Sequence, residues 1–166
     1  MSGVALIVRI AEEHLEGFRE ALDSVARERA YLALLEAPPL AEMRKFVLRT
    51  IAQRAPQFVA LADARVVGWC DILPKPHPTM RHSGVLGMGV ISEYRGRGIG
   101  RALMDATLQA AKARGISRVE LTVRVDNEPA KRLYESFGFE VEGKCRRHMR
   151  VAGEYKDSYL MALVYG

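Results

Sequence analysis

A mixed α/β fold is the class that this sequence predicts, and three observations predict it. Strand-like and helix-like periodicities alternate along all 166 residues. In the first half, two strand patterns flank a very short link, which is typical of a hairpin. In the second half, helical patterns separate the strands and form crossovers between them. The length and a hydrophobic content of 49% suit a single domain, residues 1–166, with a substantial core.

The first half is expected to contain two helices among its strands. An apolar run predicts an opening strand, and two amphipathic patterns, separated by Ala37-Pro38-Pro39, predict the helices. Pro56 ends the second helix, because proline cannot continue one. The predicted elements are strand 4–10, helix 12–30, helix 40–54, strand 57–62 and strand 65–73.

Residues 84–114 are the stretch around which the rest of the chain is organised. An apolar run, 85–91, predicts one buried strand, and a glycine- and arginine-rich loop, 95–100, follows it. A helix comes next, and Gly115 stands where a left-handed cap would end it. The apolar stripe of this helix comprises Ile99, Ala102, Leu103, Ala106, Ala110 and Ala113.

The rest of the chain predicts a loop, a helix and three more strands. Residues 74–83 contain three prolines and predict a surface loop. Strand 118–125 alternates apolar and polar residues, with Glu120 on the polar face. Asn127-Glu128-Pro129 begins a helix, because it supplies a capping residue and a proline in the first turn, and Gly138 closes it. The last predicted strands are 139–147 and 155–164.

Strand, glycine-rich loop and helix in this order make a device for holding an anion. The first turn of a helix has free N–H groups and about half a positive charge at its end. Gly96, Gly98 and Gly100 carry no Cβ atom that would keep phosphate oxygens away from those groups. We therefore expect a pyrophosphate-bearing cofactor at this loop. The alternative is a basic surface turn whose glycines serve packing.

The spacing of the glycines excludes two common phosphate loops. A dinucleotide fingerprint requires Gly-x-Gly-x-x-Gly, but Arg101 stands at the position of the third glycine. A P-loop ends in Gly-Lys-Ser/Thr, whereas this loop ends in Gly100-Arg101-Ala102. Arg95-x-x-Gly98-x-Gly100 instead resembles the Arg/Gln-x-x-Gly-x-Gly/Ala signature of the GNAT superfamily of N-acetyltransferases, which bind acetyl-coenzyme A.

Residues beyond the loop carry the same resemblance. Asn127, Ala130, Leu133-Tyr134 and Gly138-Phe139 resemble the Asn…Ala…Leu-Tyr…Gly-Phe segment of that family. The order of elements also matches, so the resemblance covers most of the chain and is strongest over residues 84–164. It implies a mostly antiparallel mixed sheet with a splayed central strand pair, flanked by about four helices.

The resemblance further implies that acetyl-CoA is the cosubstrate. In the family, backbone groups of the central strand hold the pantetheine arm and the acetyl group, and the loop grips the diphosphate. Gly87 and Gly89 fit a strand that another chain approaches closely, or a bulge. The expected cofactor-binding residues are Met88, Gly89, Val90, Arg95, Gly96, Arg97, Gly98, Ile99, Gly100, Arg101, Asn127, Lys131 and Tyr134.

Acetyl transfer to an amine also needs an acid and a base. By resemblance, Tyr134 is the general acid that protonates the leaving thiolate; the alternative is a tyrosine that packs against the sheet. Asn127 binds the pantetheine arm, caps its helix, or does both. A base is required because an amine with a pKa near ~10 is almost wholly charged at neutral pH. The strand 85–91 contains no glutamate, so the candidates are His82, Glu120 and Asp126.

The acceptor is expected to be a small amine or an amino-acid derivative. Relatives line the acceptor cleft near the end of the first helix, where this chain has Glu28 and Tyr31. The loop 74–83 is expected to narrow that cleft, which favours a small acceptor over a protein N-terminus. A different class of function stays open: a binding module that senses acyl-CoA, or contacts RNA, without turnover.

Composition narrows the partners. The net charge is +5, and its surplus gathers at the glycine-rich loop and in a second cluster, which we interpret as a solvated strand face rather than a nucleic-acid contact. No apolar stretch approaches the ~20 residues that a membrane span needs, and no targeting signal is visible, which favours a cytoplasmic protein. Cys70 and Cys145 have no metal-ligand spacing, so no metal is expected. The second cluster comprises Lys144, Arg146, Arg147 and Arg150.

The last strand is the one feature of the sequence that suggests an oligomer. Residues 155–164 are apolar on both faces, since Tyr159, Met161 and Leu163 alternate with Leu160 and Ala162. An exposed apolar face favours a subunit contact, and the sequence is thus consistent with a homodimer.

Overall fold

The structure, a computed structural model, describes residues 4–166; residues 1–3 of the predicted domain lie outside the described part. Seven strands form one sheet in the order β1-β2-β3-β4-β5-β7-β6. Neighbouring strands are antiparallel, except that β4 and β5 run parallel. The mostly antiparallel mixed sheet is therefore confirmed. Its strands are β1 (Leu6–Arg9), β2 (Gln57–Ala62), β3 (Arg65–Pro74), β4 (Ser83–Val90), β5 (Arg118–Arg124), β6 (Glu140–Val151) and β7 (Glu154–Val164).

Four α-helices flank the sheet, as expected: α1 (Leu15–Arg27), α2 (Leu40–Ala52), α3 (Ile99–Ala113) and α4 (Glu128–Ser136). The first is shorter than the predicted 12–30. Its opening turn is a separate 3₁₀ helix, η1 (Glu12–His14), in which His14 Nδ1 accepts a hydrogen bond from the Ala11 N–H. Beyond its end, Arg29 has a left-handed φ of 56°, which stops helical propagation. No helix within residues 4–166 is long and apolar enough to cross a membrane.

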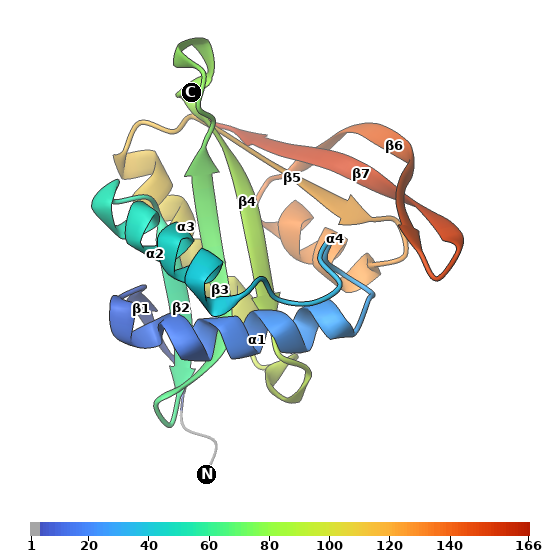
Figure 1. Cartoon of the computed structure of the whole chain (residues 1–166). Helices are drawn as coiled ribbons and strands as arrows, with labels where there is room; N and C mark the ends of the chain where they lie inside the picture. Colours follow the sequence, from blue (N-terminus) through green and yellow to red (C-terminus); the bar gives the residue numbers. More distant parts are fainter. Residues whose placement is uncertain (1–3) are drawn as a thin grey trace.

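The helices cover the two faces of the sheet. α1 and α2 lie in front of the strands in Figure 1, and α3 lies behind them. On the front face, Trp69 of β3 packs edge-on against Phe18 of α1, with ring centroids 5.8 Å apart. On the back face, the Thr107 hydroxyl of α3 reaches the carbonyl oxygen of Cys70. Trp69 and Cys70 are both buried, so β3 runs through the core on both sides, and Cys70 is a core residue as predicted.

The central strands β4 and β5 separate along their length. They pair only from Ser83 to Val85 on β4, and the last pair joins Val85 to Glu120. Leu86 to Val90 keep their partners on β3 but have none on β5. Figure 1 shows the two strands close together near the C-terminus and diverging from there. The splayed pair that the family resemblance implied is thus confirmed, and it leaves one edge of β4 without strand partners.

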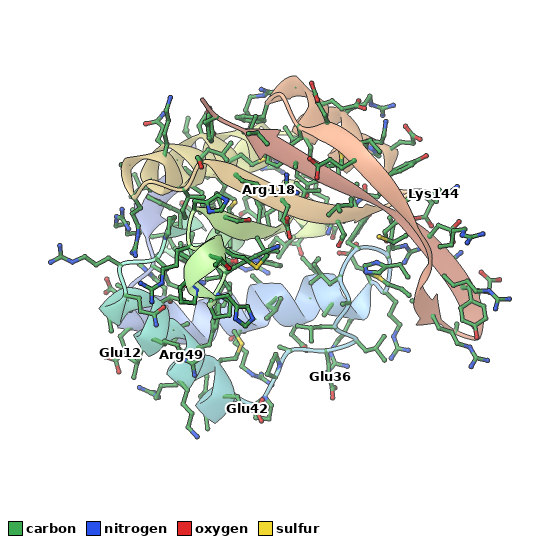
Figure 2. All side chains as sticks on the ribbon, turned by 90° about the horizontal axis from the view of Figure 1, so that it is seen from above. Glu12, Glu36, Glu42, Arg49, Arg118 and Lys144 are labelled. Atoms are coloured by element: carbon green, nitrogen blue, oxygen red, sulfur yellow. The ribbon has the colours of Figure 1, made fainter. Side chains whose placement is uncertain are left out.

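The last strand lies inside the sheet rather than at its edge. β7 lies between β5 and β6 and pairs with both, and on it Ser158, Met161 and Ala162 are buried. The edge is β6, which is longer than predicted because it continues past a bulge between Cys145 and Met149. The basic cluster of β6 is exposed, as expected, and Figure 2 shows its Lys144 at the right of the molecule, away from Glu36 and Glu42 at the bottom.

Candidate active site

A cavity of about 470 Å³ lies where β4 separates from β5. Its walls come from the outer half of β4, the glycine-rich loop, the start of α3 and one side of α4. Val25 and Tyr31, from the end of α1 and the segment after it, close the remaining side. The cavity therefore reaches both faces of the sheet, because α1 covers the front and α3 the back.

The glycine-rich loop presents free backbone amides to this cavity. Gly96 and Gly98 adopt φ values of 75° and 79°, which glycine tolerates without strain. No protein atom lies within 4 Å of a Cβ built on either one, so the space above the backbone is open. Within residues 4–166, no backbone acceptor pairs with the N–H groups of residues 96–101. The helix dipole of α3 adds partial positive charge there, so the loop fits a diphosphate.

The outer half of β4 forms the floor of the cavity. Met88 and Val90 point to the back of the sheet, where the Met88 Cε would lie 3.2 Å from a Cβ on Gly100. Gly89 faces the front, and a Cβ on it would lie 2.3 Å from the ring of Trp69. The glycine at 89 is therefore required by the tryptophan, and no bulge interrupts the pairing of β3 with β4.

Arg95 is the first residue of the loop signature, and its side chain points away from the loop. Its Nε donates to the carbonyl oxygen of Val90 (2.8 Å), and its two terminal nitrogens hold both carboxylate oxygens of Glu28. The guanidinium also stacks over the ring of Tyr31, 4.7 Å from its centroid. Hydrogen bonding to Glu28 raises the pKa of Arg95. Glu28 and Tyr31, predicted to bind the acceptor, thus meet Arg95 and join α1 to the end of β4.

Three other predicted cofactor-binding side chains fold back onto the protein. Arg97 donates to the carbonyl oxygen of Glu93, and Arg101 donates to Ser136 Oγ. Lys131 pairs with Glu135 at 2.6 Å and does not line the cavity. The backbone of the loop, rather than these side chains, is what faces the cavity.

Tyr134 and Asn127 line the cavity on the α4 side. Tyr134 is 8% exposed and packs against Phe139, and its burial raises the pKa of the phenol, which keeps its proton at neutral pH. Asn127 caps α4, because its Oδ1 accepts from the N–H of Ala130 at 3.4 Å. The packing role of Tyr134 and the capping role of Asn127 are therefore real, and both residues also face the cavity.

The predicted bases lie elsewhere. Asp126 pairs with Arg124 and does not line the cavity. His82 is exposed beside the start of β4. Gly87, which precedes the first residue of β4 that lines the cavity, is five residues further on, or about 16 Å along an extended strand. Glu120 faces the front of the sheet between Lys75 and Arg118. Burial alone would raise the pKa of Glu120, but hydrogen bonds from those two cations outweigh it and hold the pKa below its usual range. Neither residue lines the cavity.

The loop before β4 is also remote from the cavity. Residues 75–82 contain the short 3₁₀ helix η2 (Pro78–Met80) and join β3 to the start of β4, near the C-terminus in Figure 1. None of them lines the cavity, so they do not narrow it as expected.

Sequence reasoning missed several residues around the site. Val25 and Tyr94 are not among the predicted site residues, yet both line the cavity. Arg124 lies on the polar face of β5 but is 7% exposed. It binds both oxygens of Asp126 and the carbonyl oxygen of Arg29. The Arg-x-Asp spacing was the one available signal, since alternate residues of a strand share a face.

Fold and site together define a class: a transferase whose split sheet and loop amides receive a diphosphate-bearing carrier. The model of the acetyltransferase (GNAT) family matches residues 11–139. The chain therefore belongs to the GNAT acetyltransferase family.

Curated relatives agree with this assignment. An L-amino acid N-acetyltransferase of Escherichia coli K12 is 38% identical over 109 residues, which are 65% of this chain and 67% of the relative. An N-alpha-acetyltransferase of Sulfurisphaera tokodaii is 41% identical over 116 residues, 63% of this chain and 66% of the relative. These matches span about two thirds of each relative's length.

Solved structures match nearly the whole chain. A GNAT-family acetyltransferase of Streptococcus pneumoniae has a TM-score of 0.89 at 25% identity, covering 96% of this chain and 99% of that one. A phosphinothricin acetyltransferase of Sinorhizobium meliloti, solved in complex with acetyl-CoA, has a TM-score of 0.91 at 20% identity, covering 99% and 90%. At that lower identity, the likeness supports the fold.

Proposed function

We propose that this enzyme transfers the acetyl group of acetyl-CoA to the primary amine of a small molecule, such as an amino acid. The observation that carries the proposal is the row of unpaired amides at residues 96–101, which opens into the cavity between β4 and β5. The family membership supplies the acetyl transfer, and the amino-acid N-acetyltransferase among the relatives supports the acceptor class.

Different residues of the chain bind the carrier and transfer protons. Acetyl-CoA supplies an activated acyl group as its thioester. The amides of residues 96–101 neutralise the diphosphate, and the partnerless edge of β4 offers backbone groups to the rest of the carrier. Tyr134 keeps its proton, because burial raises the pKa of its hydroxyl, and can donate it to the departing sulfur.

The state of the two cysteines favours direct attack by the amine over an acyl-enzyme intermediate. Cys70 is fully buried, and burial raises the pKa of its thiol, so it remains protonated and inaccessible. Cys145 lies on β6 and does not line the cavity. Both are free thiols. The amine and the carrier must therefore be bound at the same time.

The test has two stages. Calorimetric titration with acetyl-CoA measures carrier binding, and free-thiol release over a panel of amino acids, amino-acid derivatives, polyamines and short peptides measures transfer. We expect binding, with turnover confined to one class of small amines. Binding without turnover across the whole panel would support a sensing module instead.

Acetylation of a protein N-terminus is the second candidate, because an N-alpha-acetyltransferase is among the relatives. Because the loop 75–82 does not line the cavity, one reason for expecting a small acceptor no longer holds. Preferential turnover of peptides over the corresponding free amino acid would favour this candidate.

A further inference from the structure

A buried carboxyl group lies beside the point where β4 and β5 part. Asp71 of β3 is 8% exposed and pairs across the sheet with Gly87. A Cβ on Gly87 would lie 3.5 Å from Asp71 Oδ1, so the carboxyl group lies over the bare backbone of the glycine. Gly87 is two residues beyond Val85, the last residue of β4 that pairs with β5, and precedes Met88, where the cavity lining begins.

Asp71 approaches this point from the front of the sheet. Trp69, two residues earlier in β3, faces the same way and packs on Phe18 of α1. Met88 points to the back, toward the start of α3 and the phosphate-binding amides. A carrier held by the loop therefore enters from the back. The carboxyl group of Asp71 lies toward the front, beside Gly87, which precedes the first lining residue of β4; Asp71 itself is not among the lining residues.

Among residues 4–166, no neighbouring group forms a hydrogen bond or an ion pair with this carboxyl group. The residue paired with it on β2 is Gln57, whose Oε1 accepts from Thr50 at 2.7 Å and whose Nε2 has no partner. Burial is the one cause that shifts the pKa of Asp71, and it raises this pKa to about 7. A carboxyl group near that value exchanges protons readily at neutral pH.

The charged groups around Asp71 do not compete for this role. Lys75 and Glu120 face the front of the sheet but pair with each other, and Arg124 pairs with Asp126. Cys70, on the back, is held neutral because burial raises its pKa. The residues of α1 and α2 that cover this face are apolar apart from Thr50: Phe18, Leu22, Val25, Met43 and Val47.

We propose that Asp71 is the proton acceptor for the attacking amine, directly or through one water. This inference rests on the proposed acetyl transfer. The ammonium gives one proton to the Asp71 carboxylate, and the neutral nitrogen forms the amide bond as the carbon–sulfur bond breaks. Tyr134 gives a proton to the thiolate and regains one from solvent. The second proton of the nitrogen and the proton on Asp71 leave to solvent, so each turnover releases one proton in net.

The experiment compares the wild type with Asp71→Asn and with Asp105→Asn, a matched change at an exposed position of α3. Profiles of kcat/KM against pH are measured together with the affinity for acetyl-CoA. We expect Asp71→Asn to lower kcat/KM for the amine by ~100-fold or more and to leave acetyl-CoA affinity unchanged. The rise of kcat/KM near pH 7 should disappear in this variant, while the rise due to the substrate's own amine remains. Asp105→Asn should behave as the wild type.

A second readout is independent of turnover. Carbon-13 NMR of labelled aspartate, assigned with Asp71→Asn, gives the pKa of the carboxyl group directly in the unmodified protein. A value near the ordinary one for aspartate, or an unchanged pH profile in Asp71→Asn, would overturn the inference while the acetyl transfer stands. A wild type that binds no acetyl-CoA, or acetylates no amine, would instead overturn the proposed function.

Discussion

The two sides of the cavity are built differently. On the back of the sheet, the carrier side consists of backbone: the amides of residues 96–101 and the edge of β4. On the front, the proposed acceptor side draws on side chains from distant parts of the chain. Tyr31, which lines the cavity, and Glu28 follow α1, and Asp71, which lies beside the lining at Gly87, comes from β3.

This difference explains why the carrier can be inferred more readily than the acceptor. A backbone site needs glycine at fixed spacing, so its ligand class can be recognised from few residues. A side-chain site varies with each residue that packs into it, so its ligand depends on the whole arrangement. We therefore expect the carrier side to be common to the family and the acceptor side to differ among its members.

The largest expected effect tests the backbone side. Gly98→Val places a branched side chain in the open space of the loop, at a φ of 79° that β-branched residues avoid. We expect acetyl-CoA affinity to fall by ~100-fold, because the amides become both obstructed and misdirected. Calorimetry measures the change.

Gly115→Val is the matched control for that variant. Gly115 has a similar φ of 82° at the other end of α3, and no atom lies within 4 Å of its Cβ position. It carries the same backbone strain far from the cavity. An equal loss of affinity in both variants would show that strain in α3, rather than blocked amides, is responsible.

The junction of the two sides is tested at Tyr134. Tyr134→Phe removes the hydroxyl without changing the packing on Phe139, so we expect kcat to fall by ~10- to 100-fold with acetyl-CoA affinity retained. Steady-state kinetics separate the two quantities. Tyr165→Phe, outside the cavity lining, serves as the control, and an unchanged kcat in Tyr134→Phe would remove the residue from the mechanism.

The acceptor side makes a prediction about stability. The pKa of Asp71 is raised from 3.8 to about 7 in the folded state, so the native protein holds this proton more tightly than the unfolded chain. Its contribution is fully present below about pH 4 and is lost as pH rises through about 7. Asp71→Asn should therefore unfold with a free energy larger by about 2–4 kcal/mol at pH 8 and nearly unchanged at pH 4.

Denaturant unfolding at several pH values checks this. Asp105→Asn should show no such pH-dependent gain, since its side chain is exposed. A wild type whose stability does not fall between pH 4 and pH 8 relative to Asp71→Asn would contradict the burial of an unpaired carboxyl group.

The smallest effect concerns the link between the two sides. Glu28→Gln weakens the paired hydrogen bonds to Arg95, which join α1 to the end of β4. Because the pair is about one-third exposed, we expect a modest change, about fivefold in KM for the amine. Glu36→Gln, which breaks a more exposed ion pair of the same segment with Arg27, should leave KM unchanged.

Local patterns predicted most of the fold. The strand β2 has the predicted bounds, 57–62, and Gly115 and Gly138 end their helices in the left-handed region. The errors have a tertiary cause. β6 extends past a bulge that the alternation rule does not anticipate, and the strand order, in which β7 lies between β5 and β6, differs from the chain order.

Residues that line the cavity could be predicted where the backbone decides their place, and not where packing decides it. The loop, Asn127 and Tyr134 line the cavity, and their part in cofactor binding stays a prediction. Gly89 was expected to make room for a ligand or a bulge, but it makes room for the ring of Trp69. Asp71 gave no signal, because a lone aspartate in an apolar run has no partner at a recognisable spacing.

The sequence by itself determined the family, the strand–loop–helix unit and the anion-binding amides, because glycine spacing and periodicity act over a few residues. The tertiary structure decided how the charged side chains near the cavity are paired. It turned Arg95 toward Glu28, tied Glu120 to two cations, and left Asp71 unpaired over Gly87. The charge state of a side chain depends on burial and on neighbours from other elements, and only folding brings those together.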